Sequence, residues 1–431
     1  MIWNPAAETM NLAARAALQR ERLAATLEWA RARVPFYAAR LGAPSACERP
    51  DLAALPFTRK TDLREHYPFG LFAVPRREVV RIHASSGTRG KPTVVGYTAG
   101  DLDVWREVMA RAMVAAGARP GDLLHIAFGY GLFTGGLGFH DGAERIGMTV
   151  VPASAGNTTR HHLLLQDFQP AGLAATPSFA LHVAETLREQ GGDPRALGLR
   201  YGMYGAEPWT EGMRAALERA LGCPAADVYG LSEIIGPGVA GECEARAGLH
   251  VADDHFLPEI VDPATGQPQP PEQEGELVLT TLTKRAMPVI RYRTGDVTSL
   301  AVEPCVCGRT SARIGRIKGR CDDMLVIKGV NLYPSEVESA LLAIDELEPH
   351  YQLLVDRTAT LARLEVQVEV AGGVLDACGG FDPAHPRLAA LQRRAGERLQ
   401  KAIGLAVELR IVEPRSIPRS EGKAVRVVER R

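Results

Sequence analysis

The sequence predicts an α/β fold: a large N-terminal domain of doubly wound, mostly parallel sheets plus a β meander, then a small α+β domain. Between residues 122 and 233, short apolar runs alternate with helical patterns. Such alternation is typical of βαβ units, in which helices cover both faces of a parallel sheet. The chain then becomes rich in Gly and Pro, and its last part alternates strands with helices. We therefore predict two domains, residues 1–319 and 320–431.

The individual elements follow from the same patterns. Residues 12–41 repeat apolar side chains at helical spacing, which predicts amphipathic helices. The runs expected as strands are LLHIAF, TVVPAS, GLAATP, RYGMYGA and ADVYG, and the intervening helices are GFHDGAERIG, SFALHVAETLREQ and TEGMRAALERALG. DPATGQPQPPEQEGELVLTTL predicts a loop followed by a strand of the meander. The C-terminal domain is expected to alternate MLVIKGV, PSEVESALLAI, YQLLVDR, LEVQVEV, RLAALQRRAGERLQKAI and VELRIVE.

Composition excludes several classes of protein. The 431 residues include 50 Lys and Arg against 51 Asp and Glu, a net charge of -1, whereas nucleic-acid and polybasic membrane proteins need excess positive charge. A hydrophobic content of 46% argues against disorder. The chain has neither a signal-peptide pattern nor a long uncharged apolar run, and seven Cys are too few for a disulfide scaffold. We expect a soluble, reduced, cytoplasmic protein.

A loop rich in Gly and hydroxyl groups, HASSGTRGKPT at residues 83–93, is a candidate phosphate site. Small residues let backbone N–H groups approach phosphate oxygens, while hydroxyls and one ammonium add donors. Only two residues separate its two Gly, so it is not a Walker A loop. By itself the segment could equally be a solvated turn. Its candidate ligands are Ser85, Ser86, Gly87, Thr88, Gly90 and Lys91.

Further motifs follow in a fixed order along the chain. They are YGAEP at residues 204–208, YGLSE at 229–233, YRTGD at 292–296, GRCDD at 319–323 and PRSEGK at 418–423. This ordered set resembles the adenylate-forming superfamily of acyl-CoA ligases, adenylation domains and luciferases. The segments YGYGLFTGGLG, GAEPW, YGLSEIIGPGVA and IKGVNLYPSEVE resemble more closely the phenylacetate-CoA ligase family. The likeness extends over residues 20–430.

The resemblance implies a site for ATP and Mg²⁺. The loop at residues 83–93 would hold the β- and γ-phosphates, and Glu233 would bind Mg²⁺, which prefers hard carboxylate oxygens. Asp296 would accept hydrogen bonds from both ribose hydroxyls, with Arg320 assisting. Tyr229 would offer a flat apolar face to the adenine. The other residues expected around the nucleotide are Gly205, Ala206, Glu207, Pro208, Gly230, Leu231 and Ser232.

It also implies a catalytic lysine and a moving domain. Lys423 would offset the charge that develops on the α-phosphate as the carboxylate attacks. The C-terminal domain would then rotate about Asp322, and Gly329 would border the tunnel for the CoA thiol. The wider superfamily often has Arg where this chain has Asn331, so a charge-based grip on the adenylate phosphate from that position is in doubt.

The acid is expected in a pocket with aromatic and Gly-rich walls, which suit a flat ring. Phe133 could instead pack in the core, and His140 or Asp141 could meet a ring substituent, although a structural role is favoured for both. No extra cation in these segments would pair with a second acid group. The candidate substrate residues are Tyr130, Phe133, Thr134, Gly135, Gly136, Ile234, Gly236, Pro237 and Gly238.

The spacing of the cysteines indicates a metal site. Cys243 and His250 are seven residues apart, and Cys305 and Cys307 follow about 55 residues later. Three thiols and one imidazole are a ligand set of tetrahedral structural zinc. Free thiols are the alternative interpretation.

Together these features predict an ATP-dependent aryl-acid CoA ligase, with phenylacetate as the favoured acid and a homodimer as the expected assembly. Its partners would be the aromatic acid, ATP and CoA, with neither nucleic acid nor membrane. A benzoate-type acid, such as an aminobenzoate or hydroxybenzoate, and a carrier-protein thiol acceptor remain open. A catalytically silent binding protein is disfavoured because Lys423, Glu233 and Asp296 are all present.

Overall fold

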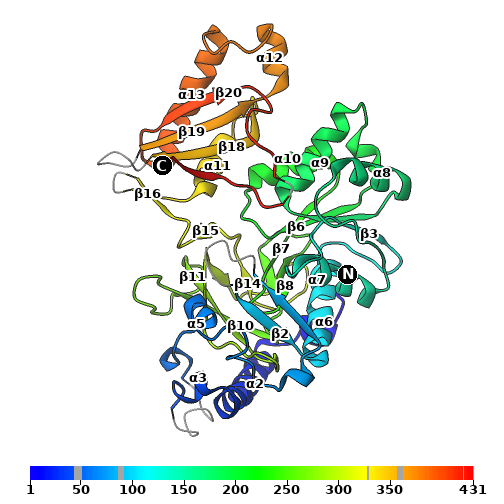
Figure 1. Ribbon diagram of the computed structural model, residues 1–431, viewed down its shortest axis with the longest axis vertical. Coiled ribbons are helices and arrows are strands. Elements are labelled where there is room, and N and C mark those ends of the chain that lie inside the picture. The colour runs from blue at the N-terminus through cyan, green and yellow to red at the C-terminus, as the bar shows by residue number, and fades with distance from the viewer. Residues whose placement is uncertain (43–50, 86–91, 328–329, 357–362, 421, 431) are drawn as a thin grey trace. The chain divides into compact units, whose positions relative to one another are not determined.

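The protein is described by a computed structural model, which covers residues 1–431 except 43–50, 86–91, 328–329, 357–362, 421 and 431. The chain divides into two compact units (Figure 1). Unit 1 comprises Met1–Ala175, Ala196–Ala206 and Cys223–Arg316, and unit 2 comprises Thr176–Arg195, Glu207–Gly222 and Ile317–Arg431. Unit 2 thus includes two stretches from the middle of the chain, and the domain boundary at residues 319 and 320 stays a prediction.

Unit 1 contains most of the helices and strands expected before residue 319. Its described helices are α1 (Pro5–Glu8), α2 (Leu12–Arg33), α3 (Pro35–Ala38), α5 (Lys60–Glu65), α6 (Ala99–Ala115), α7 (Gly135–Ile146) and α8 (Thr158–Phe168), with short 3-10 turns at Leu52–Ala54 and Arg76–Glu78. Its described strands are β1 (Arg81–Ala84), β2 (Val94–Tyr97), β3 (Leu123–Ile126), β4 (Thr149–Val151), β5 (Gly172–Ala175), β6 (Tyr201–Gly205), β7 (Ala225–Leu231), β8 (Gly236–Glu242), β9 (Leu249–Val251), β10 (Phe256–Val261), β11 (Gly275–Thr281), β12 (Tyr292–Thr298), β13 (Leu300–Ala301) and β14 (Arg313–Ile314).

The main sheet has the order β13-β14-β9-β8-β7-β6-β5-β3-β4 among the described strands. Strands β3 to β7 run parallel, while β7, β8, β9, β14 and β13 pair antiparallel. The parallel strands are apolar runs because sheets of this kind are covered on both faces. Leu124, Ile126, Ala174 and Met203 are accordingly fully buried. The predicted α/β class and the parallel strands are confirmed.

The strand order places several loops at one edge of the sheet. β4 lies on one side of β3 and β5 on the other, so the chain reverses direction across the sheet between them. Ligands of open α/β sheets bind beyond the carboxyl ends of the strands near such a reversal. The carboxyl ends of β3, β6 and β7 lead directly into residues 127–134, 206–207 and 232–235. These ranges contain eight of the candidate site residues, namely Tyr130, Phe133, Thr134, Ala206, Glu207, Ser232, Glu233 and Ile234.

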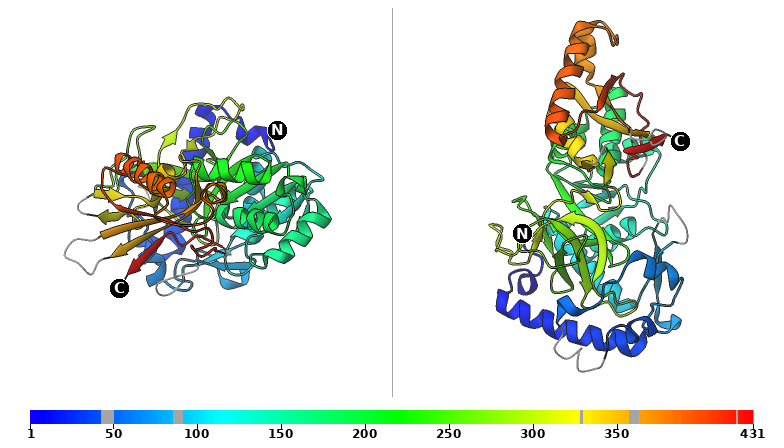
Figure 2. Two further views of the ribbon diagram at one scale, coloured as in Figure 1. Left: turned by 90° about the horizontal axis from the view of Figure 1, so that it is seen from above. Right: turned by 90° about the vertical axis from the view of Figure 1, so that its left-hand side faces the viewer.

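The helical N-terminal segment packs along the same unit, as predicted. In α2, the long blue helix in Figure 2, Thr26 donates a hydrogen bond to the carbonyl of Leu282, and Gln19 donates one to that of Asp253. The meander consists of β10, β11 and β12, paired antiparallel. A separate antiparallel hairpin joins β1 and β2.

Unit 2 has its own sheet and core. Its described elements are α9 (Pro177–Glu189), α10 (Glu211–Leu221), β15 (Gly319–Arg320), β16 (Leu325–Ile327), β17 (Val330–Leu332), α11 (Pro334–Leu341), β18 (Leu347–Asp356), β19 (Arg363–Val370), α12 (Gly372–Cys378), α13 (Pro386–Ile403), β20 (Glu408–Val412) and β21 (Val427–Arg430). The sheet order is β20-β19-β18-β21. Val337 of α11, Leu353 of β18, Val366 of β19 and Leu399 of α13 share one buried core. The short turn Pro194–Leu197 spans the border of the two units.

Every helix in the described parts of the chain is too short or too polar to cross a membrane.

Candidate active site

Glu233, the candidate Mg²⁺ ligand, lies in the tight turn between β7 and β8, where it is buried. Its Oε1 is 3.7 Å from Nζ of Lys60 in α5. Its main-chain carbonyl accepts a hydrogen bond of 3.2 Å from Nζ of Lys284. Two cations therefore bracket this residue, one at the carboxylate and one at the backbone.

Lys284 lies beside the candidate Mg²⁺ ligand, and motif comparison did not predict it. The residue is 3% exposed, and its Nζ lies 4.9 Å from the ring centroid of Tyr97. Burial lowers the pKa of Lys284 to about 8, although the negative charges of Asp101 and Glu233 act to raise it. Asp101 in turn accepts backbone hydrogen bonds from Arg285 and Ala286, which holds the turn that carries the lysine. The available signal was a lone Lys just before the apolar run AMPVI.

The structure brings together two residues predicted to meet the nucleoside. Tyr229 at the end of β7 donates a hydrogen bond of 2.5 Å to Oδ2 of Asp296 in β12. Asp296 is buried, and its own N–H is held by Oγ1 of Thr294. A carboxylate at this position has further lone pairs that can accept hydroxyl groups. The phenol ring is half-buried and therefore presents part of its face to solvent.

Gly205 and Gly230, near the ends of β6 and β7, allow close backbone packing beside the Tyr229–Asp296 pair. A Cβ at Gly205 would lie 2.1 Å from the carbonyl oxygen of Val228, and one at Gly230 would lie 1.9 Å from that of Gly236. Only Gly fits at such separations. Ala206 follows with a φ of 70°, so the chain turns sharply at the carboxyl end of β6. Leu231 is partly buried.

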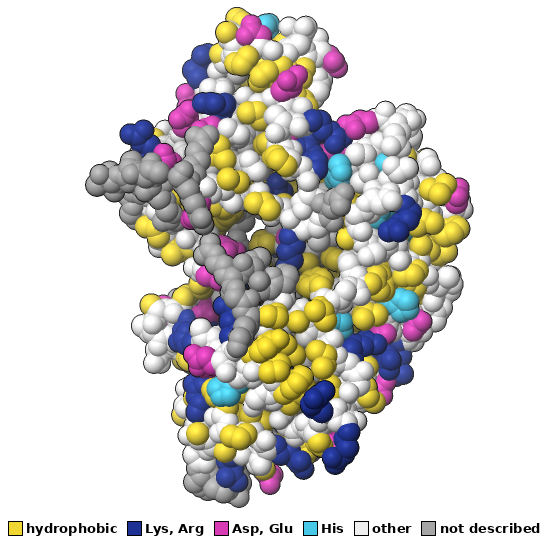
Figure 3. Space-filling view, viewed as in Figure 1, with side chains coloured by type: hydrophobic (Ala, Val, Ile, Leu, Met, Phe, Trp, Pro, Cys, Tyr) yellow, Lys and Arg dark blue, Asp and Glu magenta, His cyan; other side chains and the backbone are white. Residues whose placement is uncertain are grey.

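The phosphate loop lies mostly outside the described residues. Ser85, which precedes it, is anchored to the neighbouring strand, because its N–H donates to the carbonyl of Thr93 and its Oγ accepts from the Thr93 N–H. In the space-filling view, hydrophobic side chains gather over the β1–β2 hairpin (Figure 3), where Ile82 is exposed. The predicted residues outside the description are Ser86, Gly87, Thr88, Gly90, Lys91 and Gly329.

A rigid aromatic wall lies behind the predicted acid pocket. Trp105 of α6 stacks on Tyr97 with a centroid separation of 5.2 Å, and its Nε1 donates to the carbonyl of Pro237. A Cβ at Gly138 would lie 2.5 Å from Cγ of Pro237, and one at Gly236, where φ is 121°, would lie 2.3 Å from the Trp105 ring. The glycines thus let the indole and the proline approach closely. Ile234 is buried beside this wall, and Gly238 has a φ of 93°.

The opposite side of the predicted pocket comes from the loop after β3. Oγ1 of Thr134 is 3.2 Å from Oγ of Ser232, which joins this loop to the β7 turn. The hydroxyl of Tyr130 is 3.2 Å from Nδ1 of His140, and burial followed by the charge of Asp141 raises the pKa of the phenol. Phe133 is only partly buried, so it is not a residue of the closed core. Close packing also excludes side chains at Gly135 and Gly136.

Asp141 has a structural partner. Its carboxylate is 2.5 Å from Nη1 of Arg81 in β1, and it is buried. The favoured structural role for this residue fits its geometry. His140 bonds Tyr130 and also lies 3.2 Å from Glu144.

In unit 2, the candidate catalytic Lys423 is exposed and lies in a short turn. The turn is closed by Ser420, whose Oγ donates to the carbonyl of Lys423 and accepts from the N–H of Gly422. The carboxylate of Glu207, which is expected at the adenine, accepts hydrogen bonds within unit 2: Oε1 accepts from N and Oγ of Ser178, and Oε2 accepts from the N–H of Ala424. Its role at the adenine stays a prediction. Pro208 next to it is exposed.

The candidate hinge residue Asp322 is also exposed, whereas Arg320, predicted at the ribose, is partly buried. Arg320 donates from Nε to Oδ1 of Asp322 at 2.9 Å. Asn331 in β17 points to solvent rather than into the core of unit 2. Its role at the adenylate phosphate stays untested.

The four predicted metal ligands lie together in unit 1. One donor atom from each of Cys243, His250, Cys305 and Cys307 lies within 4.8 Å of the others. Sγ of Cys243 and Cys305 are 3.9 Å apart, too far for a disulfide, and Nε2 of His250 is 3.4 Å from Sγ of Cys307. Burial lowers the pKa of His250 to about 3, so its imidazole is neutral and able to ligate.

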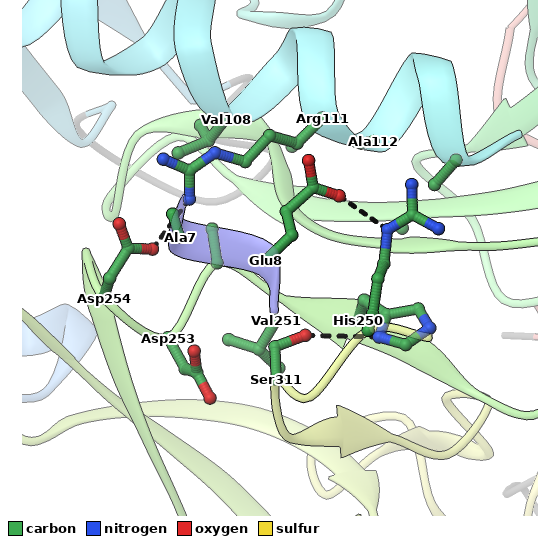
Figure 4. A pocket seen from close by; sticks show the side chains of 15 residues that line it. Ala7, Glu8, Val108, Arg111, Ala112, His250, Val251, Asp253, Asp254 and Ser311 are labelled. Carbon is green, nitrogen blue, oxygen red and sulfur yellow. Dashed lines mark hydrogen bonds and ion pairs between the residues drawn. The ribbon is translucent and has the colours of Figure 1, made fainter. Parts of the chain in front are cut away.

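The residues around this cluster hold and polarise the donors (Figure 4). Nδ1 of His250 is 3.2 Å from Oγ of Ser311, which leaves Nε2 directed at the thiols. Burial opposes ionisation of Cys307, but hydrogen bonds from the backbone and guanidinium of Arg309 lower its thiol pKa. Arg309 is itself paired with Glu8 of α1 at 2.5 Å. Motif spacing found the ligands but not this buried ion pair.

Comparison with known proteins gives one consistent result. The model of the family described as AMP-binding enzyme matches residues 11–282, and that of the AMP-binding enzyme C-terminal domain matches residues 329–431. A phenylacetate-coenzyme A ligase of Thermus thermophilus is 52% identical over 440 residues, covering 99% of each chain. One of Escherichia coli is 48% identical, covering 98% of this chain and 97% of its own. A crystal structure of 2-hydroxyisobutyryl-CoA ligase in the postadenylation state matches with a TM-score of 0.93 and 32% identity, covering 100% and 92% of the two chains.

Proposed function

The chain belongs to the AMP-binding enzyme family, and from that premise we propose that it is an ATP-dependent phenylacetate-CoA ligase. Enzymes of this kind use ATP and CoA to join an acid to a thiol, releasing AMP and pyrophosphate. The observation that carries the choice of acid is the near-full-length similarity to two phenylacetate-coenzyme A ligases. The aromatic wall around Trp105 supports it, because a planar apolar ring fits against such a surface.

In the first half-reaction, the acid carboxylate attacks the α-phosphorus of ATP and pyrophosphate leaves. The Tyr229–Asp296 pair would bind the nucleoside, Asp296 through the ribose hydroxyls and Tyr229 through the base. Glu233 would hold Mg²⁺, which neutralises phosphate charge when bound. Lys60 and Lys284 keep the Glu233 turn in place from two sides. Lys423 would stabilise the charge that builds up on the transferred group.

In the second half-reaction, the CoA thiol attacks the acyl carbonyl and AMP leaves. The mixed anhydride is already activated, so the chain needs no nucleophile of its own. Lys423 has no task in this step, and the part of the chain that carries it would move away about Asp322. The two half-reactions therefore depend on different residues and can be separated experimentally.

A pyrophosphate-release assay tests the proposal. Release is measured with phenylacetate, benzoate and anthranilate, each with and without CoA, and the thioester is identified by mass spectrometry. We expect the highest kcat/KM with phenylacetate and a phenylacetyl-CoA product. Preference for a benzoate-type acid would correct the substrate. Acid-dependent release without any CoA thioester would indicate a carrier-protein acceptor, and no acid-dependent release would reject the enzyme.

We also propose that Cys243, His250, Cys305 and Cys307 bind a structural Zn²⁺. The support is chemical: three sulfur donors and one neutral imidazole nitrogen lie within 4.8 Å of one another, and Zn–S and Zn–N bonds of about 2.3 and 2.1 Å require such a gathering. Four protein ligands leave no open coordination position, so the ion would join loops rather than catalyse. Metal analysis of protein purified without added zinc is the test, and a ratio near zero would reject the ion.

We also propose that the protein forms a homodimer. Light scattering should report a mass near twice the 46.5 kDa of one chain. A mass equal to one chain at micromolar concentration would contradict it.

A further inference from the structure

One face of α9 binds the segment that leads to Lys423. At the C-terminal end of the helix, Glu189 forms an ion pair with Arg415. One turn earlier, Glu185 has Oε1 2.5 Å from Nε2 of His350 and Oε2 3.5 Å from Nε of Arg419. The two glutamates are four residues apart and therefore lie on the same side of the helix.

The contacts continue at the N-terminal end of the helix. Thr176, the N-cap, donates from Oγ1 to the carbonyl of Gly422 at 2.8 Å. Glu207 joins the first turn of α9, at Ser178, to the N–H of Ala424. Residues 415, 419 and 422 of the segment contact residues 189, 185 and 176 of α9 and its N-cap, in that order. The segment therefore runs antiparallel to the helix, and the last of these contacts lies next to Lys423 in the chain.

Chain connectivity ties the N-terminal end of this register to the active-site edge of the sheet. Thr176 is the residue after β5, and Glu207 comes two residues after β6. Both strands end at the carboxyl edge, where adenylation is proposed to take place. The residues that bind the Lys423 segment therefore follow directly, in the chain, after two strands of the main sheet.

Arg419 lies in the segment that leads to Lys423 and has two carboxylate partners. Arg419 donates from Nη1 and Nη2, each at 2.7 Å, to the fully buried carboxylate of Glu369 in β19. That bidentate pair keeps Arg419 fixed to the C-terminal sheet. Its Nε remains directed at Glu185, so α9 meets an arginine that is already held in position.

The named contacts between the segment and α9 are polar. Charged residues, among them Glu348 and Arg188, line much of a neighbouring cavity of about 430 Å³, and apolar residues such as Leu181 and Leu342 line the rest. Polar contacts resemble the reversible contacts between domains. Charge pairs of this kind can form and break at modest cost.

We propose that α9 is a docking track that positions Lys423 for adenylation, with Glu185 and Glu189 as its positioning residues. The inference rests on the proposed ligase function. During adenylation the pairs with Arg419, His350 and Arg415 would be made, and during thioester formation they would be broken. Variants of the track should therefore slow the first half-reaction and spare the second.

The Glu189–Arg415 pair offers a charge-swap test, because both side chains are partly exposed and tolerate substitution. Glu189→Arg and Arg415→Glu are made singly and together. Each single variant should lower kcat for acid-dependent pyrophosphate release about threefold to fivefold, the range of an exposed ion pair. KM values for ATP and acid, and thioester formation from supplied aryl-adenylate, should stay at the unaltered level. The double variant should recover to within about twofold.

A matched control uses a second exposed pair of unit 2 that does not touch α9. Glu346 and Arg394 lie 2.6 Å apart, and their swap should leave both half-reactions unchanged. Glu185→Gln, which removes the partly buried charge of the track, should lower the rate of adenylation about tenfold if it folds with the normal circular dichroism spectrum. Amide exchange at Ala424 provides a readout without catalysis: it should accelerate in the single variants and return to normal in the double variant.

A double variant that stays as slow as its parents would overturn the proposal, and so would equal slowing of both half-reactions. The exchange measurement separates the two hypotheses. If the unaltered protein adenylates no acid while Ala424 still responds to the charge swap, the ligase function fails and the docking contact stands. If adenylation is normal and Ala424 exchanges alike in all variants, the docking track is wrong.

Discussion

The residues proposed to bind the nucleotide and the lysine proposed to catalyse are held in opposite ways. Glu233 and Asp296 are buried in unit 1, and the neighbouring strands β6 and β7 contain glycines, Gly205 and Gly230, that admit no side chain. Lys423 is exposed in unit 2, in a turn that depends on a few hydrogen bonds and charge pairs. A rigid framework suits groups needed in both half-reactions, whereas a weakly held loop suits a group needed in only one.

The sharpest way to test this contrast is Lys423→Ala. Loss of the ammonium should lower adenylation about 1,000-fold, because it removes charge stabilisation at the reacting phosphate. Thioester formation from supplied aryl-adenylate should stay within about twofold of normal, measured by product mass spectrometry. Lys401→Ala, another exposed lysine of unit 2, is the control. Equal loss of both steps would mean that the lysine is not confined to the first.

Metal removal tests how rigid the framework of unit 1 is. Cys305→Ser should abolish zinc binding and lower the free energy of unfolding by about 3 kcal/mol, the stabilisation expected from a ligand well above its dissociation constant. Chelation of the unaltered protein should have the same effect in thermal melts. Cys223→Ser replaces a buried thiol outside the cluster and should keep the metal. Similar melting temperatures in both variants would contradict a structural ion.

Gly138→Ala tests whether the aromatic wall is closely packed. Alanine normally stabilises a helix relative to glycine, but here its Cβ would lie 2.5 Å from Pro237 and 2.8 Å from Trp105. Overpacking should cost about 2 kcal/mol and raise KM for the acid while leaving KM for ATP unchanged. Gly131→Ala in the preceding loop meets no atom within 4 Å and should be neutral. Equal behaviour of the two variants would place the acid elsewhere.

The smallest expected effect is a pH dependence of the charge pairs on α9. Burial by itself would raise the pKa of Glu185. The hydrogen bond from His350 and the charges of His350, Arg419 and Arg415 outweigh burial and hold this pKa below its ordinary value of 4.5. A depressed carboxyl pKa stabilises the folded state above the ordinary value, and that stabilisation is lost as pH falls through the lowered pKa. Thermal melts from pH 7 to 3 should show a steeper acid decline in the unaltered protein than in Glu185→Gln. Glu397→Gln, on the exposed face of α13, should keep the steep decline.

Sequence reasoning was strongest where local pattern decides structure. The apolar runs of β3, β5, β6 and β7 and the cluster of Cys243, His250, Cys305 and Cys307 were identified from spacing. Each depends on residues close together in the chain or on a distinctive donor set. The motifs predicted Tyr229 and Asp296 at the same nucleoside, but the hydrogen bond between them was not predicted.

Long-range partners of charged residues could not be predicted in the same way. Lys284 reaches the backbone of Glu233 across 51 positions, and Arg309 pairs with Glu8 across 301. Neither pairing leaves a periodic signal, because any of many carboxylates could satisfy a buried cation. Glu207 illustrates the same limit: its motif indicated an adenine contact, while its carboxylate in the structure caps α9 and holds Ala424. Such choices depend on tertiary packing.

The short hydrogen bond between Tyr229 and Asp296 has a consequence for nucleotide selection. One carboxylate orients the ring proposed to face the base and also offers its remaining lone pairs to the sugar. The carboxylate of Asp296 would then contribute both to discrimination between bases and to discrimination between ribose and deoxyribose. The losses of binding free energy caused by changing the base and by changing the sugar should therefore not be additive. A nucleotide that displaces Asp296 also breaks its hydrogen bond to Tyr229, the residue proposed to contact the base.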